Sequence, residues 1–327
     1  MEIAMIGLGK MGANMAQRLM RGGHKVVGYD PAEAARTLLE KSGAQTAASL
    51  EQMVAKLKAP RTVWLMVPAG EITDSTITNL VPLTGSRDGL DLVVLIDSAA
   101  RNSLGNQLQE LAQFIKSLPP TARVAVAYMQ FGHVAFATQF TTDHAQAIGG
   151  LHLPGGTPGS SGSPYFCLSD LAKRWPEGDR AMRREVLMVT DGVDDYNRRY
   201  DPDDPYVQAA MQDAIKAGLV VYSIYWTGRG RADATQYANN TGQNLLVQVT
   251  EATGGKSFWE GMGNPVSFQP YLEEFSRRLR NQYELSFVTQ FSGKPAVEGF
   301  KLKLNVPGAE VNSPQQVFVA RPGLAQN

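Results

Sequence analysis

The chain has 327 residues, and its 31 Lys and Arg balance 31 Asp and Glu, so the formal net charge is zero. The length suits about two domains that each bury a core, and the charge balance gives no support to a nucleic-acid partner. A single cysteine, Cys167, excludes an intrachain disulfide framework, and we expect it to be packed rather than reactive. No apolar run is long enough for a membrane span, and Glu2 stands where a signal peptide carries positive charge. We therefore expect a cytoplasmic protein with no membrane partner.

The first 30 residues carry a glycine pattern between two apolar stretches. Gly7, Gly9 and Gly12 follow EIAMI and open a helical pattern, and a second stretch, KVVGY, ends at Asp30. This order is the fingerprint of dinucleotide-binding domains: the first glycine permits a tight turn, the second lets a pyrophosphate approach, and the third lets helix and strand pack closely. Asp30 would bind ribose hydroxyls and repel a 2′-phosphate, and no arginine follows it closely, which favours NAD over NADP. Asp30 could also be the N-cap of the next helix, with Pro31 at its first position, and both roles can coexist.

The same pattern continues to about residue 84. We predict helices at about 32–42 and 49–57, a strand TVWLMV at 62–67 with Trp64 and Met66 in the core, and a further helix. A dinucleotide domain that stops after this fourth strand leaves the strand 62–67 with an open edge. We expect this edge to be covered by the second domain, paired with another copy by self-association, or poorly ordered.

Two stretches of this segment point to a family. MIGLGKMGANMAQRLMRGGHKVVGYD and VWLMVPAGEITDSTI resemble the N-terminal part of 6-phosphogluconate dehydrogenases of the shorter, NAD-preferring type, over about the first 83 residues. The resemblance implies that the dinucleotide is held by Gly7, Leu8, Gly9, Lys10, Met11, Gly12 and Asp30. It also implies that Val67, Pro68 and Ala69 lie along the nicotinamide half.

The catalytic segments of that family do not follow. The family should continue with an Asp-Gly-Gly-Asn-Ser loop, a Gly-Gly-Val-Ser-Gly-Gly substrate loop, a lysine base and a glutamate acid. The chain has LIDSAARNS in place of the first loop and no counterpart of the others. Without proton-transfer and substrate-binding groups, we assign no catalytic residue and do not expect 6-phosphogluconate oxidation. An NAD(P)-binding oxidoreductase of this family, or a cofactor sensor, is the alternative.

From residue 91, strand and helix patterns alternate again. LDLVVLIDS, REVLMVTDG, LVVYSIYW and KSFW predict strands separated by helices, and RVAVAYMQ and HVAFATQF predict a hairpin around Phe131–Gly132. Near-continuous apolar strands between helices predict a doubly wound, mainly parallel sheet, whose sites lie at the carboxyl ends of the strands, where Asp97 and Asp191 fall. YELSFV, GFKLKLNV and QVFVA predict a small β-element at the end of the chain.

The pieces LIDS, GGTP, LMVTDG, VVYSIYW, EATGGKSFW and LRNQYELSFV together resemble a von Willebrand factor A-type domain of the acidobacterial variety, over residues 91–288. Strand 91–97 is then the first strand of the second domain, in the place where a dehydrogenase needs its next strand. The predicted organisation is a partial Rossmann domain (1–84), a linker (85–90), a von Willebrand factor A-type domain (91–280), C-terminal β-strands (281–320) and a tail (321–327). A natural fusion and an artefactual joint both fit the sequence.

The resemblance also raises a metal question. Such domains often bind Mg²⁺ through Asp-x-Ser-x-Ser, a Thr and an Asp, but residues 97–101 are DSAAR, so Ala99 offers no oxygen and Arg101 brings a positive charge that could pair with Asp97 or Asp191. The ligands that remain are Asp97, Ser98, Thr157 and Asp191. The sequence favours a metal-free rim that binds a protein ligand near Asp97, Thr157 and Asp191 over bound Mg²⁺.

The segment TDGVDDYNRRYDPDDP places several acids beside Asp191. Its composition is typical of a solvated acidic loop with turn-forming Asp and Pro. A Ca²⁺ site or a site for a basic partner is the alternative.

Overall fold

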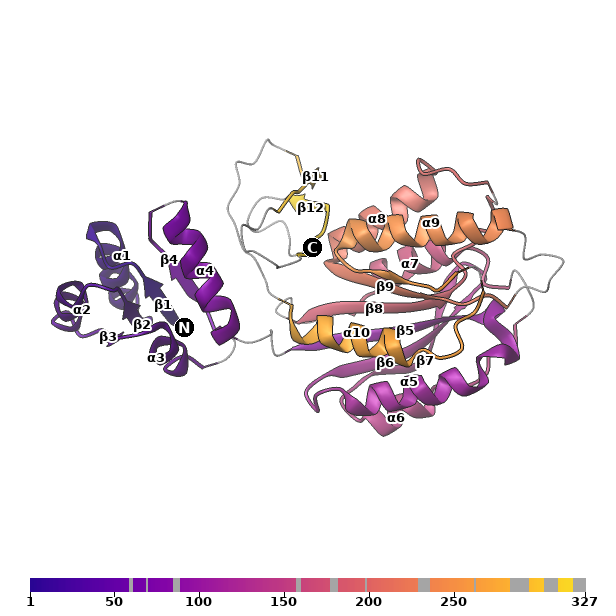
Figure 1. Ribbon diagram of the computed structural model, residues 1–327, viewed down its shortest axis with the longest axis horizontal. Helices are drawn as coiled ribbons and strands as arrows, with labels where there is room; N and C mark the ends of the chain where they lie inside the picture. The colour runs from indigo at the N-terminus through magenta and orange to yellow at the C-terminus, as the bar shows by residue number, and fades with distance from the viewer. Residues whose placement is uncertain are drawn as a thin grey trace. The chain divides into compact units, whose positions relative to one another are not determined.

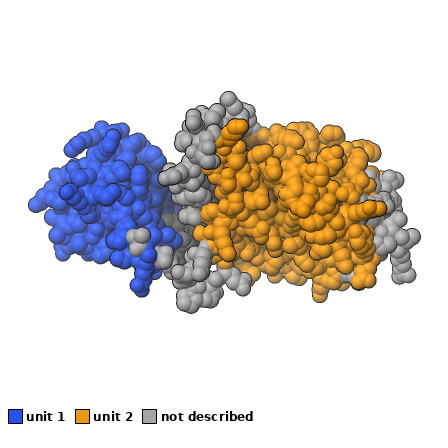
Figure 2. Space-filling view, turned by 90° about the horizontal axis from the view of Figure 1, so that it is seen from above, with its two compact units in different colours: residues 1–88, 279–285, 305–309 blue, residues 89–278, 286–304, 310–327 orange. Residues whose placement is uncertain are grey.

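The computed structural model describes residues 1–58, 61–68, 70–84, 89–156, 160–176, 182–197, 199–228, 236–261, 263–282, 294–302 and 311–319. The chain divides into two units, shown in different colours in Figure 2. Unit 1 consists mainly of residues 1–88, and unit 2 mainly of residues 89–278 with most of the C-terminal residues. Each unit has its own sheet, and the two are described separately.

Unit 1 is built on a sheet of four parallel strands. They are β1 (Glu2–Ile6), β2 (Lys25–Tyr29), β3 (Gln45–Ala47) and β4 (Val63–Leu65), in the order β3-β2-β1-β4. The helices are α1 (Lys10–Arg21), α2 (Glu33–Glu40), α3 (Leu50–Ala55) and α4 (Glu71–Thr84). Ala4 and Ile6 belong to one buried cluster, whereas Ile3 and Met5 belong to another. Because alternate side chains of a strand point to opposite faces, both faces of this sheet are covered.

Two predictions for unit 1 were wrong. Trp64 was expected in the core but is 40% exposed, because β4 is the outermost of the described strands and its neighbours Val63 and Leu65 are the ones packed against a buried cluster. The N-cap of α2 is Ala32 rather than Asp30. Asp30 instead accepts a hydrogen bond from the Ala32 N–H, so the turn precedes the helix rather than starting it.

Unit 2 contains a six-stranded sheet in the order β10-β9-β8-β5-β6-β7. The strands are β5 (Leu90–Asp97), β6 (Arg123–Gln130), β7 (His133–Thr141), β8 (Arg183–Thr190), β9 (Leu219–Tyr225) and β10 (Ser257–Phe258). All neighbours are parallel except β6 and β7, which form the predicted hairpin around Phe131–Gly132. Every residue of β5 is buried between β8 and β6. The strand that follows the dehydrogenase-like segment is therefore a central strand of the second sheet.

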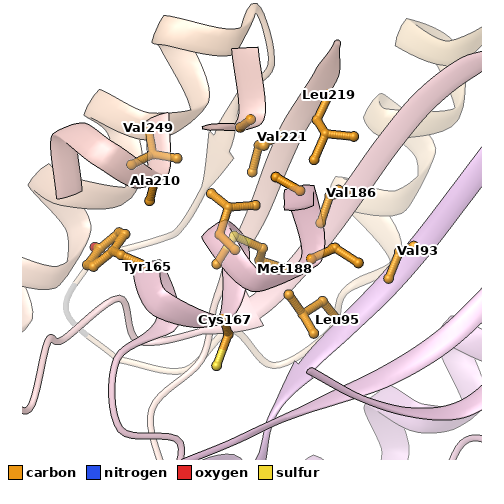
Figure 3. Close-up of a cluster of buried hydrophobic side chains, with 14 of the residues drawn as sticks. Val93, Leu95, Tyr165, Cys167, Val186, Met188, Ala210, Leu219, Val221 and Val249 are labelled. Atoms are coloured by element: carbon orange, nitrogen blue, oxygen red, sulfur yellow. The ribbon is translucent and has the colours of Figure 1, made fainter. Parts of the chain in front are cut away.

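Helices cover both faces of this sheet (Figure 1). They are α5 (Gly105–Ser117), α6 (His144–Gly149), α7 (Pro164–Lys173), α8 (Pro205–Ala217), α9 (Gln236–Thr253) and α10 (Gln269–Arg280), and a 3-10 helix, η1 (Ser98–Leu104), follows β5. Figure 3 shows the core on one face, where side chains of α7, α8 and α9 meet those of the strands. Cys167 is buried in this core, as predicted. On the other face, Phe114 of α5 and Phe275 of α10 have ring centroids 5.5 Å apart.

A small antiparallel sheet completes the fold. It pairs β11 (Ala296–Gly299) with β12 (Gln316–Val319). The predicted fold class is confirmed: a partial Rossmann-like parallel sheet, a mainly parallel doubly wound sheet and a C-terminal β-element. The strand expected at 283–288, most of the linker and the tail 321–327 lie outside the described residues. None of the helices formed by the described residues is long and apolar enough to span a membrane.

Candidate functional site

The glycine loop of unit 1 joins the end of β1 to the start of α1. Gly7 has φ +89°, and a Cβ there would lie 2.4 Å from the carbonyl oxygen of Met66. A Cβ on Gly12 would lie 1.8 Å from the carbonyl oxygen of Gly7, so a side chain at either position forces the backbone apart. A Cβ on Gly9 would meet nothing within 4 Å. The backbone is therefore packed tightly against Gly7 and Gly12, whereas the space next to Gly9 is free of protein atoms.

Helix α1 starts at this loop without a side-chain cap. Gly9 is its N-cap, no side chain accepts from its first N–H groups, and its first turn holds no acid. The first N–H groups of a helix have no partner inside the helix, and with the helix dipole they favour an anion. Lys10 and Met11 are exposed here, whereas the Leu8 side chain is buried. The loop can thus offer N–H groups to a phosphate.

Asp30, at the end of β2, is fixed beside the loop. Its Oδ2 accepts a 2.7 Å hydrogen bond from the Leu8 N–H, and its Oδ1 accepts a 2.8 Å bond from the Ala32 N–H. A carboxylate has about four acceptor positions, so two remain for ribose hydroxyls. The N–H of Leu8 is already used, and Leu8 therefore supports the loop rather than binding the dinucleotide through that group.

A cation that the sequence pattern did not predict lies next to Asp30. Arg36 Nη1 donates to the carbonyl oxygens of Asp30 (2.6 Å) and Pro31 (3.0 Å). Arg36 lies six residues further on, in α2, and side chains in a helix point back toward its N-terminus. The six-residue spacing between Asp30 and Arg36 could therefore have indicated this contact. The expectation that NAD is preferred over NADP therefore rests on the Asp30 carboxylate and not on the lack of a nearby arginine.

The residues predicted for the nicotinamide half are placed in part. Val67 lies beside the first glycine, since its Cγ1 would be 3.0 Å from a Cβ at Gly7. Pro68 is exposed next to it, and Ala69 lies outside the described residues. The glycine loop, Asp30 and Val67 therefore gather at the carboxyl ends of β2, β1 and β4, whereas the assignment of a dinucleotide to them stays a prediction.

The second candidate site is the rim of unit 2, defined as the loops that follow β5 and β8. Asp97 ends β5 and is buried; its Oδ1 accepts from the Ala99 N–H (2.8 Å) and its Oδ2 from the Thr190 hydroxyl (2.7 Å). Asp191 follows β8, and its Oδ1 accepts from the Val193 N–H (3.0 Å). Burial, and secondarily the charge of Asp191, raises the pKa of Asp97 to about 6. The rim therefore holds two neighbouring carboxylates in a poorly solvated place.

Position 99, where a Mg²⁺ site of this type needs a hydroxyl ligand, is alanine, and each oxygen of Asp97 accepts one hydrogen bond from the protein. The residues present therefore fit a Mg²⁺ site poorly. Thr157 and the Arg101 side chain lie outside what the structure describes, and Ser98 is buried. In the described parts of the chain, no three His, Cys, Asp or Glu side chains are grouped to hold a metal. The set Asp97, Ser98, Thr157 and Asp191 stays a prediction, and we route no chemistry through a metal.

Comparison with known proteins bears on the first site. Residues 2–111 match the family model described as the NAD binding domain of 6-phosphogluconate dehydrogenase. The 6-phosphogluconate dehydrogenase homologue YqeC of Bacillus subtilis (strain 168) is 40% identical over 88 residues, which are 27% of this chain and 29% of YqeC. The NAD(+)-dependent, decarboxylating 6-phosphogluconate dehydrogenase of Haloferax volcanii is 38% identical over 94 residues, 29% of this chain and 30% of the enzyme. The chain thus spans less than a third of these relatives.

Solved structures similar to the chain include an aerotolerance-related membrane protein from Bacteroides fragilis (12% identity, TM-score 0.41, 59% of this chain and 100% of that one). The pilus adhesin SpaC from Lactobacillus rhamnosus GG is another (11% identity, TM-score 0.40, 60% and 30%). At these values the likenesses carry no argument about function. The N-terminal segment of this chain is thus similar to the NAD-binding domain of 6-phosphogluconate dehydrogenases, and unit 2 has the mainly parallel sheet expected from the resemblance to a von Willebrand factor A-type domain.

Proposed function

We propose that the chain binds NAD through unit 1 without oxidising 6-phosphogluconate, and that unit 2 is a protein-interaction module. One observation carries this proposal: the family match runs to residue 111, but β5, within that match, is a central strand of the second sheet. The chain therefore keeps the glycine loop and Asp30 while its next strand serves another fold. A cofactor half-site can bind without a partner domain that supplies chemistry.

The loop after β5 supports the absence of dehydrogenase activity. LIDSAARNS stands where the family has its first substrate loop, and it includes Asp97, whose carboxylate is bound to Thr190 and to the Ala99 N–H of unit 2. An acid held in this way in unit 2 is not available as a substrate ligand of unit 1. The alternative, an oxidoreductase or a cofactor sensor, differs from this proposal in its expected activity.

The experiment is calorimetric titration of the full chain with NAD and, in parallel, NADP. We expect micromolar NAD binding and weaker NADP binding, with no NADH formed when 6-phosphogluconate is added. No heat with either nucleotide would overturn the NAD part of the proposal. A measurable rate of 6-phosphogluconate oxidation would overturn the rest and favour the oxidoreductase.

For unit 2 we propose a protein ligand at the rim near Asp97, Thr157 and Asp191. The loops at the carboxyl ends of parallel strands are where doubly wound sheets bind their ligands, and Asp97 and Asp191 lie at this edge. Substituting Asp97 by Asn should change partner binding without changing NAD binding, and equal effects on both would contradict separate sites.

Self-association through β4 is a further part of the proposal. Among the described residues β4 is an edge strand, and its Trp64 is 40% exposed, so this edge presents main-chain groups and an apolar ring. Sedimentation velocity of the full chain should show a dimer that Trp64→Lys dissociates. A wild-type monomer at all concentrations would exclude this pairing.

A further inference from the structure

Three aromatic rings pack together at one end of the six-stranded sheet of unit 2, and a fourth aromatic residue, Phe131, lies in the adjacent turn. Phe131, Tyr196 and Tyr206 are 76%, 68% and 57% exposed, and Phe166 lies half-buried between the tyrosines. The ring centroid of Phe166 is 5.1 Å from that of Tyr196 and 5.1 Å from that of Tyr206. We call these four residues the aromatic surface. They come from the β6–β7 turn, α7, the loop after β8 and the first turn of α8.

Main-chain hydrogen bonds hold these segments together. The N–H groups of Phe131 and Gly132 donate to the carbonyl oxygens of Ser160 (2.8 Å) and Ser161 (2.7 Å). A Cβ at Gly162 would lie 3.3 Å from the carbonyl carbon of Phe131 and 3.4 Å from the ring of Tyr196. The turn and the loop after β8 therefore meet at the residues before α7, and the rings are presented by a hydrogen-bonded frame.

The backbone at Phe131 is strained. Phe131 has φ +51° and Gly132 has φ +78°, as in a two-residue hairpin turn that favours Asn or Asp followed by Gly. Positive φ is uncommon for a bulky side chain, and the ring of Phe131 gains little packing in return because it is mostly exposed. Strain that brings no packing is a feature of sites that meet a partner.

Carboxylates lie behind and beside the aromatic surface. The N–H of Tyr196 donates to the buried Asp194 (2.9 Å), and the N–H of Tyr206 donates to the buried Asp204 (2.8 Å). Asp201 and Asp203 are exposed on the same loop, which also carries the exposed Arg199. The segments that carry Tyr196 and Tyr206 are thus rich in carboxylates, and the ring faces themselves attract cations.

We propose that the aromatic surface binds an arginine-containing extended segment of a partner protein, an inference that rests on the interaction role proposed for unit 2. Arginine fits better than lysine because its planar guanidinium stacks on a ring while its N–H groups bind a carboxylate. The exposed Tyr196 and Phe131 rings supply the stacking faces, and Asp201 and Asp203 supply acceptors. The aromatic surface lies beside the rim near Asp97 and extends it toward the β6–β7 edge of the sheet.

The test is fluorescence anisotropy of the full chain with a labelled peptide of alternating arginine and glycine. Matched peptides replace arginine with lysine or glutamate, and a polyproline peptide tests the other ligand class that aromatic grooves bind. We expect the arginine peptide to bind about tenfold more tightly than the lysine peptide, and the glutamate and polyproline peptides not to bind. Equal binding of the arginine and lysine peptides, tighter binding of polyproline, or no binding of the arginine peptide would overturn the inference.

Variants locate the binding. Phe131→Gly removes a ring and relieves the positive φ, so the variant should fold, and we expect it and Tyr196→Leu each to weaken arginine-peptide binding about tenfold. The control is Trp259→Leu, which removes an exposed aromatic ring next to β10, at the opposite edge of the same sheet. Unchanged binding by Phe131→Gly and Tyr196→Leu, or an equal loss in Trp259→Leu, would also overturn it. Calorimetry with NAD on the same samples tests the proposed cofactor binding separately, so the two failures can be told apart.

Discussion

The two sheets place opposite chemistry at the same structural position. At the carboxyl end of β1, unit 1 has a glycine loop, open space above Gly9 and the uncapped N-terminus of α1. At the carboxyl ends of β5 and β8, unit 2 has the buried carboxylates Asp97 and Asp191. Loops at this edge form the sites of parallel sheets in general. The few residues after each strand therefore decide whether main-chain N–H groups or carboxylates line the edge.

The largest expected effect is a difference in stability between substitutions at two glycines of the same loop, Gly12 and Gly9. Gly12→Val should destabilise unit 1 by at least about 3 kcal/mol and abolish NAD binding, because its Cβ would lie 1.8 Å from the carbonyl oxygen of Gly7. Gly9→Ala should leave stability within about 0.5 kcal/mol, since its Cβ meets nothing within 4 Å. Thermal unfolding and NAD calorimetry on both variants provide the measurement.

Gly9→Ala is the informative member of this pair. If a pyrophosphate approaches the loop at Gly9, the added methyl group should weaken NAD binding at least about tenfold while the fold persists. NAD binding equal to that of the wild type would show that the dinucleotide does not approach there.

The stability of unit 2 should depend on pH through the buried carboxylate of Asp97. The pKa of Asp97 is raised from 3.8 to about 6, chiefly by burial, so between these values the folded state holds a proton that the unfolded state has lost. Stability then falls as the pH rises through this window, by about 2 to 3 kcal/mol once Asp97 is fully charged. Urea unfolding of unit 2, followed by the fluorescence of the buried Trp175 and Trp226, measures this slope.

Asp97→Asn isolates that contribution from other groups. The pKa of Asp194 is also raised by burial, whereas those of Asp170 and Glu274 are lowered by hydrogen bonds and ion pairs, so the wild-type curve is a sum. The amide can still accept from the Ala99 N–H. We expect the stability of Asp97→Asn relative to the wild type to grow between pH 4 and 7; a constant difference would show that Asp97 titrates normally.

The same contrast explains which features the sequence could predict. The glycine pattern and the acid at Asp30 are local, and a hydrophobic strand that ends in Asp97 predicts its own place in a second sheet. The exposure of Trp64 depends on what lies beyond the edge of the sheet, and the sequence of the strand contains no such information. The position of Arg36 depends on how its side chain returns along α2.

The aromatic surface shows the limit most clearly. Phe131, Phe166, Tyr196 and Tyr206 span three intervening segments of the chain, and each alone is an ordinary aromatic residue. They meet because the doubly wound order puts the β6–β7 turn, α7 and α8 at one end of the sheet. Of these features, only the turn at Phe131–Gly132 could be predicted locally, because two strand patterns separated by two residues indicate a hairpin with positive φ.

A smaller effect concerns the proposed choice of nucleotide at the glycine loop of unit 1. Asp30→Asn keeps an acceptor for the Leu8 N–H but removes the charge that would repel a 2′-phosphate, and Arg36 lies next to it. We expect the preference for NAD over NADP to shrink about tenfold, equivalent to about 1.4 kcal/mol. Arg36→Ala in the Asp30→Asn background should restore part of the preference. Parallel calorimetric titrations with both nucleotides test this, and an unchanged ratio would remove Asp30 from the site.

The smallest expected effect tests the backbone strain at Phe131, in the β6–β7 turn of unit 2. Phe131→Gly should stabilise unit 2 by about 0.5 to 1 kcal/mol, because glycine adopts positive φ without strain but gains freedom in the unfolded chain. Gly132→Ala is the matched control of opposite sign: φ is +78° there, and a Cβ would lie 3.4 Å from the Cβ of Phe166, so we expect a loss of about 1 kcal/mol. Urea unfolding of both variants gives the comparison. If Phe131→Gly were instead destabilising, the exposed ring would contribute packing to the fold itself, and the strain at the turn would need no partner to explain it.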